Sequence, residues 1–525
     1  MKFKDLTDEQ IEESRKIYWN RELKWDERMK ILMKKFNKSE RTVRKWCVKL
    51  GFKENTYDND SEQYKIAQKR VFDKTKSYYL ITWAQNNTPV HERFFDNLKA
   101  YAEFLDADLH VIAGRYRNPT SVFSDVKHDV WDKKVIPYLD ATRNEINNHV
   151  TILSDVKIQP TAVNPMTGMQ GFSVKTSCIF GSPKVQLQSI PVIHKNEPRV
   201  MMTTGACTKK NYTDSKAGKK GEFHHTYGAV IVEVKDLDKV FVRQITARDD
   251  GDFNDLYFNV SNGVVRRNEY IEAIIYGDIH AGEHDQSLLD ETRDKILDKL
   301  KPKNVILHDV FSGLSINPHE AKDVFLQYGK QLNGHDDLKK ELDILIDVLA
   351  QFKDQEKVVI VRSNHDVFLD RWLKNEDWKK QPSLKNSRLY MRLSDMLLKQ
   401  YEDNPYKVKG VIPEIINDVF PEYITLGLTD SYKVKGFELG MHGHIGINGA
   451  RPGVESFRKL NTKIVSAHTH SAFRKDGLVV CGTSTKLKLN YNHGPSSWTQ
   501  GHTIIDNYGK AQSIIFFDGE FTTFE

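Results

Sequence analysis

The sequence predicts an α/β protein with a layered core, preceded by a small all-helical segment. From residue 77 onward, short apolar runs of strand length alternate with stretches of helical periodicity, which is the pattern of strands and helices packed in layers. Residues 1–52 show helical periodicity alone, and residues 53–76 are polar with no sustained apolar stripe. We therefore divide the chain into a helical domain (1–52), a linker (53–76), a middle α/β domain (77–265) and a larger layered domain (266–525).

The composition excludes several classes of protein. The chain has 525 residues, of which 39% are hydrophobic and 29% are charged, as is usual for a globular protein of several domains. No apolar stretch approaches the roughly 18 residues of a membrane span, and the N-terminus lacks the apolar centre of a signal peptide. The four cysteines lie far apart, so we expect free thiols in a reducing cytoplasm, not a disulfide framework or a cysteine zinc site.

Three helices are expected in residues 1–52. Thr7 is placed to cap a helix that runs to about Asn20, and apolar residues recur at helical spacing from Trp25 to Phe36. Ser39 is placed to cap a third helix, which ends before Gly51. Two short helices joined by a tight turn predict a helix-turn-helix domain.

The net positive charge of the chain is concentrated in this helical domain. Residues 1–52 contain 15 basic and nine acidic residues, a net charge of +6 that equals the +6 of the whole chain. The exposed face of the third helix would carry Arg41, Arg44, Lys45 and Lys49. Such a helix can enter a major groove while its cations contact phosphates, so we predict DNA binding. The alternative is a solvated basic face that binds a protein partner.

The middle domain begins with a predicted β-α-β unit and carries no chemistry that we recognise. A short helix is expected near Tyr64 to Phe72, within the linker. The loop from Thr208 to His225 is rich in lysine and glycine, and it either contacts a phosphate backbone or is merely solvated. A role in placing substrate or in assembling subunits is our hypothesis for this domain. The expected elements are strands at Tyr78–Ala84, Leu109–Ala113, Val185–Ile193, Val200–Thr204 and Ala229–Val234, and a helix at Val90–Leu105.

The larger domain is organised around Ile274 to Asp285. An apolar run ends in Gly277, and Asp278 and His280 follow two residues apart. Side chains at the junction of a strand and its loop are well placed for chemistry. The same pattern recurs four times, with Asp309 after Val305–Leu307, with Asn364, His365 and Asp366 after Val358–Val361, with His442 and His444 after Phe437–Met441, and with His468 and His470 after Ile464–Val465.

These residue types predict a metal site. Carboxylate, imidazole and amide oxygen together suit a divalent ion such as Mn²⁺, Fe²⁺ or Zn²⁺. Seven candidate ligands are too many for one ion and fit two. Taken singly, each residue is more simply read as an ordinary buried His or Asp, but five blocks of one pattern are hard to explain in that way. Predicted helices at Leu288–Leu300 and Leu338–Phe352, and a long helical insertion from Asp370 to Tyr406, complete the layered domain.

The order of the five blocks resembles that of the calcineurin-like metallophosphoesterases, over roughly residues 270–515. The first block, Asp-Ile-His-Ala-Gly, is most similar to that of the SbcD-type DNA nucleases. Two positions depart from the family pattern, because His308 precedes Asp309 and Ser363 precedes Asn364 where the family usually has glycine. Both departures alter a turn and not a ligand.

The resemblance implies a layered β-sandwich flanked by helices, two metal ions, most often Mn²⁺, and assembly into a dimer or a larger homo-oligomer. One ion would be held by Asp278, His280 and His470, and the other by Asn364, His442 and His468, with Asp309 between them. His365 would stand beside the scissile phosphate as proton donor or phosphate positioner. Asp366 would orient His365, the usual role of a carboxylate beside an imidazole.

We therefore predict a two-metal DNA nuclease. A basic helix-turn-helix ahead of a phosphoesterase resembles the nucleases with which T-odd phages degrade host DNA, which implies action in a bacterial cytoplasm. Two alternatives remain open, a phosphatase or nucleotide phosphodiesterase acting on small molecules, and a non-catalytic DNA-binding scaffold. A DNA-binding domain would be unexpected in the first, and a complete ligand set would be unexpected in the second.

Overall fold

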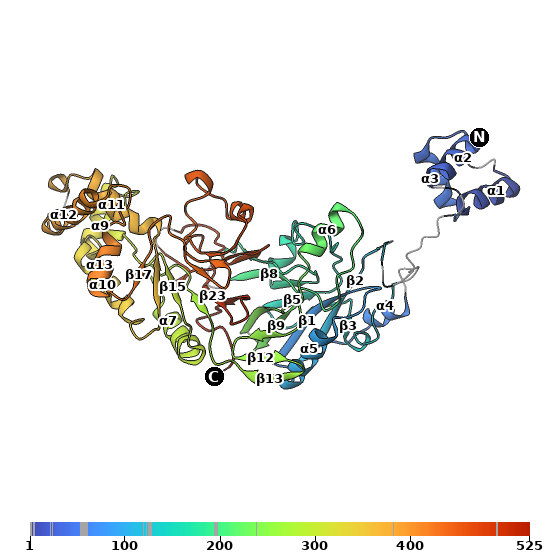
Figure 1. Cartoon of the computed structure of the whole chain (residues 1–525), viewed down its shortest axis with the longest axis horizontal. Helices are drawn as coiled ribbons and strands as arrows, with labels where there is room; N and C mark the ends of the chain where they lie inside the picture. Colours follow the sequence, from blue (N-terminus) through green and yellow to red (C-terminus); the bar gives the residue numbers. More distant parts are fainter. Residues whose placement is uncertain are drawn as a thin grey trace.

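The computed structural model is a mixed α/β protein, as predicted, with helices at its N-terminus and several sheets (Figure 1). It describes all residues except 1–2, 4–5, 21–22, 24, 53–60, 119, 122, 124–128, 194–197, 238, 382, 490–491 and 525. Within the part of the chain that it describes, no helix combines the length and the apolar character that crossing a bilayer requires.

The three N-terminal helices are where the sequence predicts them, at α1 (Asp8–Trp19), α2 (Trp25–Phe36) and α3 (Glu40–Lys49). Thr7 and Gln10 form a reciprocal capping box at the start of α1. Asn37 adopts a left-handed φ of 51° between α2 and α3. Leu32, Phe36 and Val43 are fully buried, so the apolar faces of α2 and α3 form a small core of their own. In Figure 1 these helices stand apart from the rest of the chain.

The second part of the predicted linker packs on the body of the protein. Helix α4 (Glu62–Ala67) buries Tyr64, whose ring stacks on Trp131 with centroids 6.0 Å apart. The guanidinium of Arg115 lies 3.5 Å from the centre of the Tyr64 ring, and Phe72 stacks on Tyr79. Residues 61–76 are therefore not a free tether, and residues 53–60 of the predicted linker lie outside the described residues.

A five-stranded sheet in the order β10-β9-β1-β2-β3 contains the predicted β-α-β unit. Strands β1 and β2 are parallel, and helix α5 (Glu92–Phe104) connects them. The predicted loop at 208–225 was wrong in one respect, because helix α6 (Lys216–Phe223), capped by Ser215, forms within it. The strands are β1 (Tyr78–Gln85), β2 (Asp108–Gly114), β3 (Leu139–Asp140), β9 (Gly228–Val234) and β10 (Val240–Thr246).

A six-stranded sheet in the order β17-β16-β15-β14-β23-β24 carries the first three sequence blocks. Its strands are β14 (Ala273–Ile275), β15 (Val305–His308), β16 (Val358–Val361), β17 (Ile424–Thr425), β23 (Gly501–Ile505) and β24 (Ala511–Ile515). The helices between these strands begin with α7 (Gln286–Thr292), which continues through a π-helical turn (Arg293–Leu297) into α8 (Asp298–Leu300). The others are α9 (Val324–Asn333), α10 (Leu338–Ala350), α11 (Asn364–Asn375), α12 (Ser387–Asp403) and α13 (Val411–Val419).

A ten-stranded sheet joins sequence segments on both sides of residue 265, in the order β18-β19-β20-β22-β21-β7-β8-β6-β5-β4. The junction is the antiparallel pair β7–β21. The strands are β4 (Arg143–Glu145), β5 (Val150–Leu153), β6 (Ser177–Phe180), β7 (Leu187–Ile190), β8 (Arg199–Thr203), β18 (Lys433–Val434), β19 (Phe437–Glu438), β20 (Lys463–Ser466), β21 (Phe473–Lys475) and β22 (Leu478–Val480). A three-stranded sheet, β11 (Phe253–Asp255), β12 (Phe258–Ser261) and β13 (Val264–Arg267), lies between the two segments in sequence.

The topology reveals an internal repeat that the sequence analysis did not predict. The order β3-β2-β1-β9-β10 has the same pattern of parallel and antiparallel neighbours as β16-β15-β14-β23-β24. The order β4-β5-β6-β8-β7 likewise matches β18-β19-β20-β22-β21. We call β1–β10 (residues 78–246) the first half and β14–β24 (residues 273–515) the second half.

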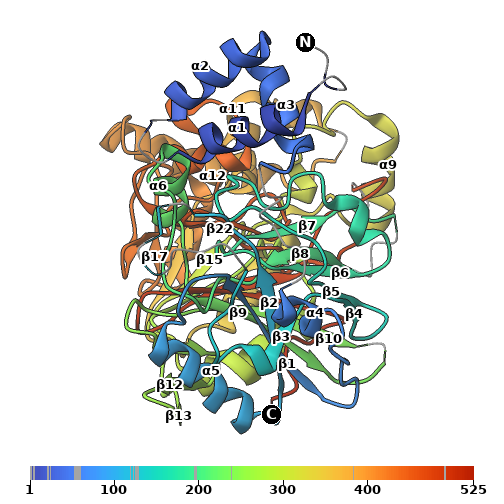
Figure 2. The same ribbon diagram turned by 90° about the vertical axis from the view of Figure 1, so that its right-hand side faces the viewer.

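The ten-stranded sheet contributes to a separate hydrophobic core in each half. In the first half, Ile81 and Val230 of the smaller sheet share a core with Ile179 and Met202 of the ten-stranded sheet. In the second half, a separate core joins the six-stranded sheet to β20 and β22. Figures 1 and 2 show the five-stranded sheet between α5 and the ten-stranded sheet. Two sheets stacked face to face with helices outside therefore occur twice along the chain.

Candidate metal centre

The predicted ligands follow strands of the second half and converge in space. Asp278 follows β14, Asp309 follows β15, and Asn364 opens α11 just after β16. His442 comes after β19, and His468 and His470 follow β20. Because β14, β15 and β16 are parallel neighbours, their carboxyl ends lie at one edge of the sheet, and the loops of the facing sheet supply the histidines.

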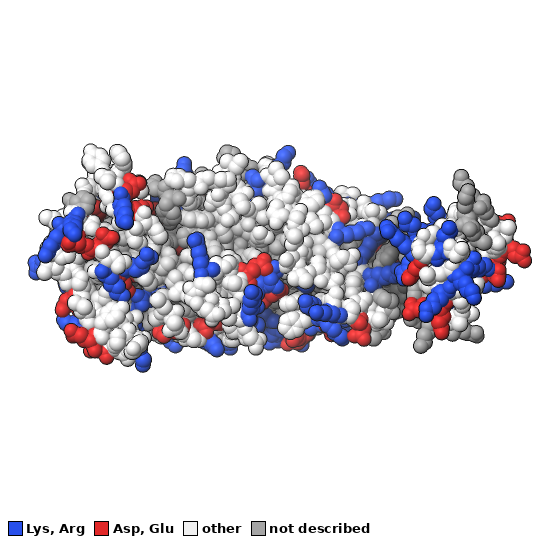
Figure 3. All heavy atoms as spheres, turned by 90° about the horizontal axis from the view of Figure 1, so that it is seen from above, with Lys and Arg blue, Asp and Glu red and all other residues white. Residues whose placement is uncertain are grey.

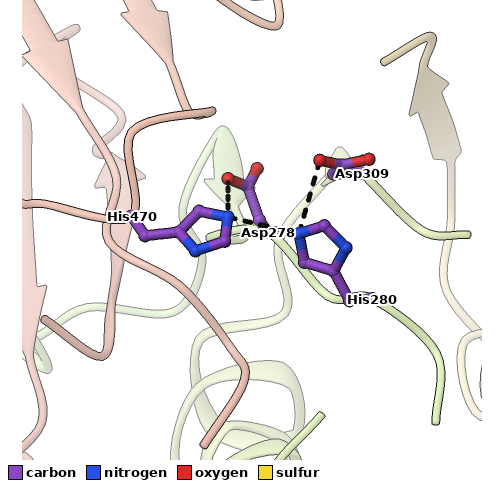
Figure 4. Close-up of side chains that lie close together, drawn as sticks. All are labelled: Asp278, His280, Asp309 and His470. Atoms are coloured by element: carbon purple, nitrogen blue, oxygen red, sulfur yellow. Dashed lines mark hydrogen bonds and ion pairs between the residues drawn. The ribbon is translucent and has the colours of Figure 1, made fainter. Parts of the chain in front are cut away.

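Four buried side chains could together hold one metal ion (Figure 4). One ligand atom from each of Asp278, His280, Asp309 and His470 lies within 4.8 Å of the others. The Nε2 atom of His470 is 2.9 Å from Asp278 Oδ2 and 3.2 Å from His280 Nε2. His280 Nε2 is in turn 3.4 Å from Asp309 Oδ2. Two ring nitrogens and two carboxylates thus face one small volume.

A second group of predicted ligands also lies close to Asp309. His442 Nε2 is 3.1 Å from Asn364 Oδ1 and 3.5 Å from Asp309 Oδ2. The rings of His442 and His468 are 5.1 Å apart between centroids. The Oδ2 atom of Asp309 therefore lies within 3.5 Å of imidazole nitrogens from both groups. This is the position that a carboxylate shared between two ions would occupy.

Unsatisfied buried atoms fit the binding of cations. Asp309 Oδ1 and His280 Nδ1 are buried without a hydrogen-bond partner among the described residues, and such orphaned groups are costly. Burial holds the pKa values of His280 and His442 well below the ordinary range, so both rings are neutral, which is the form that ligates metals. A bound divalent ion would satisfy the oxygens that the protein leaves unpaired.

The pKa values of Asp278 and Asp309 depend on each other and on their neighbours. Burial, with the charges of Asp278 and Asp366, raises the pKa of Asp309 well above its ordinary value. Burial also raises the pKa of Asp278, but His470 and neighbouring imidazoles outweigh it and hold that pKa below the ordinary value. Without a cation, the pair therefore holds its second negative charge only at a cost.

Four of the seven predicted metal ligands adopt backbone conformations that residues with side chains rarely take. The φ angles are 47° at His280, 46° at Asp309, 75° at His468 and 56° at His470. Left-handed conformations at such residues cost on the order of 1–3 kcal/mol each and persist where the surroundings enforce them. Their concentration at one site indicates that the fold holds these side chains in place for function.

The backbone behind Asp278 is held by a segment that sequence reasoning did not single out as structural. The Asp278 carbonyl accepts hydrogen bonds from Ser484 N at 2.8 Å and Thr483 Oγ1 at 3.0 Å. A Cβ at Gly277 would lie 2.5 Å from the Gly482 carbonyl oxygen, so only glycine fits there. The sequence signal was the Gly-Thr-Ser-Thr run at 482–485, which contains residues able to donate from both backbone and side chain.

His365 is oriented by a different residue than the sequence analysis predicts. Its Nδ1 atom donates to the Ser312 carbonyl at 2.6 Å, and its ring lies 4.4 Å from that of His280. Asp366 instead accepts from Ser363 N at 2.8 Å, while Ser363 Oγ accepts from Asp366 N. This reciprocal pair is a capping box at the start of α11. The Ser-x-x-Asp pattern at 363–366 could have predicted that role.

Trp498 borders the site, whereas the basic residues that are predicted to bind DNA lie far from it in sequence. The Trp498 ring is 4.2 Å from that of His470. Lys486 and Lys488, which follow the 482–485 segment in sequence, are exposed. On α3, the side chains of Arg41, Arg44, Lys45 and Lys49 are all exposed. Figure 3 shows blue side chains gathered over the N-terminal helices at the right-hand end of the molecule. Arg44 also pairs with Glu40 at 2.6 Å, which reduces the charge it presents.

The first half of the repeat carries a tryptophan where the second half carries its metal cluster. The buried indole of Trp83, near the end of β1, lies against Gly114 at the end of β2 and Gly181 just after β6. A Cβ on Gly114 would be 2.0 Å from the indole. The matching strands of the second half, β15 and β20, lead into Asp309 and His468. Across the described part of the first half, no cluster of metal-binding side chains converges in this way.

No family model matches the chain. Protein A1 of Escherichia phage T5 is 33% identical over 486 residues, which cover 88% of this chain and 84% of Protein A1. The match is therefore to most of both proteins and not to a single shared domain.

We predict that Asp309→Asn, which keeps the shape of the side chain and removes its charge, lowers the bound Mn²⁺ of the dialysed protein by more than about half. The reason is that a shared carboxylate contributes to both ions at a two-metal site. Inductively coupled plasma mass spectrometry measures the content, and the exposed Asp347→Asn is the matched control. Equal metal content in wild type and Asp309→Asn would contradict this assignment.

Proposed function

The chain belongs to the same family as Protein A1 of Escherichia phage T5, and from its candidate metal centre and its basic N-terminal helices we propose that it is a metal-dependent nuclease that hydrolyses phosphodiester bonds in DNA. The observation that carries the proposal is the position of Asp309 Oδ2, which lies within 3.5 Å of imidazole nitrogens of two separate ligand groups. One site for a single structural ion would not need the second group.

We assign the ligands to two Mn²⁺ ions. Asp278, His280 and His470 would hold one ion, Asn364, His442 and His468 the other, and Asp309 would bridge them. Bound at this site, two such ions would lower the pKa of a water molecule and stabilise negative charge on the phosphoryl oxygens. The layered arrangement of sheets in the second half supports the metallophosphoesterase fold that the five sequence blocks predict.

His365 is the residue that we assign to the scissile phosphate. It is the second residue of α11, so the positive end of the helix dipole supports an anion beside it. The hydrogen bond from Nδ1 to Ser312 leaves Nε2 as the free nitrogen. Burial lowers the pKa of His365 to about 4, so the ring is neutral until a phosphate and its charge arrive. A proton donated to the leaving oxygen would come from Nε2 of the ring once it is protonated.

DNA is the substrate that the N-terminal domain favours. The four exposed cations of α3 give this domain a basic surface. Two short helices with a tight turn between them are suited to placing the second helix in a major groove of DNA. We further propose that the protein acts on host DNA in the cytoplasm of an infected bacterium, since its relative belongs to a phage. A homo-oligomer is also part of the proposal, and it rests on the family resemblance.

His365→Ala is expected to reduce DNA cleavage with Mn²⁺ by about 10²–10⁴-fold, the usual contribution of a positioned acid or base. The measurement is gel analysis of linear and circular DNA over time, and cleavage of circular DNA distinguishes endonuclease from exonuclease action. The exposed His335→Ala should cleave as wild type does. If the wild type hydrolyses bis(p-nitrophenyl) phosphate but leaves DNA intact, the protein is instead a small-molecule phosphodiesterase.

Replacing Arg41, Lys45 and Lys49 with glutamine should weaken DNA binding and make it less sensitive to salt. Each lost phosphate contact lowers the slope of log K against log salt by about 0.9. Fluorescence anisotropy with duplex DNA between low and moderate salt gives both quantities. Lys16→Gln, on the exposed surface of α1, is the control. An unchanged slope in the triple variant would remove α3 as the DNA contact.

A further inference from the structure

A cleft of about 760 Å³ opens at the junction of the two halves, and we call it the seam cleft. The end of α6 and the end of β10 line it from the first half. The start of β20 and the turns β21–β22 and β23–β24 line it from the second half. Because β23 runs antiparallel to β14, the β23–β24 turn lies at the opposite end of the sheet from Asp278. The seam cleft is thus separate from the metal centre.

The lining of the seam cleft carries more positive than negative charge. Five cationic side chains line it, Lys184, Arg458, Lys463, Arg474 and Lys510, against the acids Asp249 and Asp476. Asp476 is already engaged, because it pairs with Arg458 and lies 3.2 Å from His224 Nδ1. Arg458 also pairs with Glu455 at 2.6 Å. Lys184 donates to the Ala162 carbonyl. Of the two acids in the lining, only Asp249 therefore remains to oppose the charge of the other three cations.

Arg474, Lys463 and Lys510 have no carboxylate partner among the described residues. Nη2 of Arg474 donates to Thr246 Oγ1 at 3.0 Å, but its Nη1 is buried without a hydrogen-bond partner. Burial lowers the pKa of Arg474 to about 10. Burial also lowers the pKa of Lys510, and the charges of Lys463 and Arg474 add to that effect, while Asp249 and Asp506 partly oppose it. Lys463 is exposed and Lys510 is half-buried, so the cost of burying a cation without an accompanying anion falls mainly on Arg474, whose Nη1 is buried and unpaired.

An exposed aromatic side chain stands at the rim of this cationic cleft. Phe223 ends α6 and is 82% exposed, although it is a large apolar residue. Its ring lies 5.0 Å from that of His224, and both residues line the cleft. An aromatic face beside a cluster of cations is the arrangement with which proteins stack nucleobases while holding the phosphates.

We propose that the seam cleft binds a nucleotide unit, with its phosphate at Arg474, Lys463 and Lys510 and its base on Phe223. An arginine fork with lysines is the usual protein partner of phosphate, and the cleft has the volume of a small-molecule site. The unit is either a free nucleotide or one residue of a nucleic-acid strand, since both present the same phosphate and base. The proposal does not depend on the metal centre or on DNA cleavage.

The test is isothermal titration of the full-length protein with ATP and with tripolyphosphate, which lacks a base. Lys463→Met/Lys510→Met should weaken ATP binding by about tenfold or more, since the loss of two charged contacts removes phosphate affinity. Phe223→Ala should weaken ATP by about fivefold and leave tripolyphosphate unchanged. Lys399→Met, whose side chain is exposed and pairs with Asp395, should bind both ligands as wild type does.

Two further arms identify the source of the unit and separate this site from the metal centre. Asp309→Asn should bind ATP with wild-type affinity, because the seam cleft does not contain Asp309. A 12-nucleotide single strand is added to the complex of ATP with the wild-type protein and with the double lysine variant. If the strand displaces ATP from the wild type but not from the variant, the seam cleft is a nucleic-acid site. If the strand does not displace ATP from the wild type, the seam cleft is a site for free nucleotides. Absence of ATP and strand binding by wild type, or equal ATP binding by the double lysine variant, would overturn the proposal.

Discussion

The placement of two buried carboxylates among buried imidazoles is the constraint on which the second half depends. Asp278 and Asp309 are almost completely inaccessible, and such groups are stable as anions only where positive charge reaches them. Around them the structure places the neutral rings of His280 and His442 and loop residues in left-handed conformations, an arrangement that suits the binding of a metal ion. The parallel strands β14, β15 and β16, the glycine at 277 and the 482–485 segment all serve to hold these oxygens at one point.

The internal repeat explains how the rest of the chain is arranged around that point. Both halves stack two sheets in the same order, and the pair β7–β21 makes one continuous sheet of their outer layers. In the first half Trp83 lies against Gly114 and Gly181, at strand ends that match those leading into Asp309 and His468 in the second half. The first half also forms one wall of the seam cleft.

Sequence reasoning could predict the parts of the structure that are encoded locally. The capped helices of the N-terminal domain, the β-α-β unit and the positions of the Asp, Asn and His residues after each strand all follow from patterns of a few residues. The packing of residues 61–76 on the body of the protein was not predicted, because Trp131, on which Tyr64 stacks, is distant in sequence. The repeat was missed because its halves share strand order and little visible sequence pattern. The partner of His365 is a backbone carbonyl of Ser312, which no side-chain pattern can reveal.

Whether Asp309 joins two ions in one site can be measured by electron paramagnetic resonance of the protein loaded with Mn²⁺. Two ions that share a carboxylate lie about 3.5–4 Å apart, close enough for their spins to couple. The account predicts the spectrum of a coupled pair in wild type, replaced by that of isolated ions in Asp309→Asn. A wild-type spectrum of isolated Mn²⁺ at full loading would contradict it.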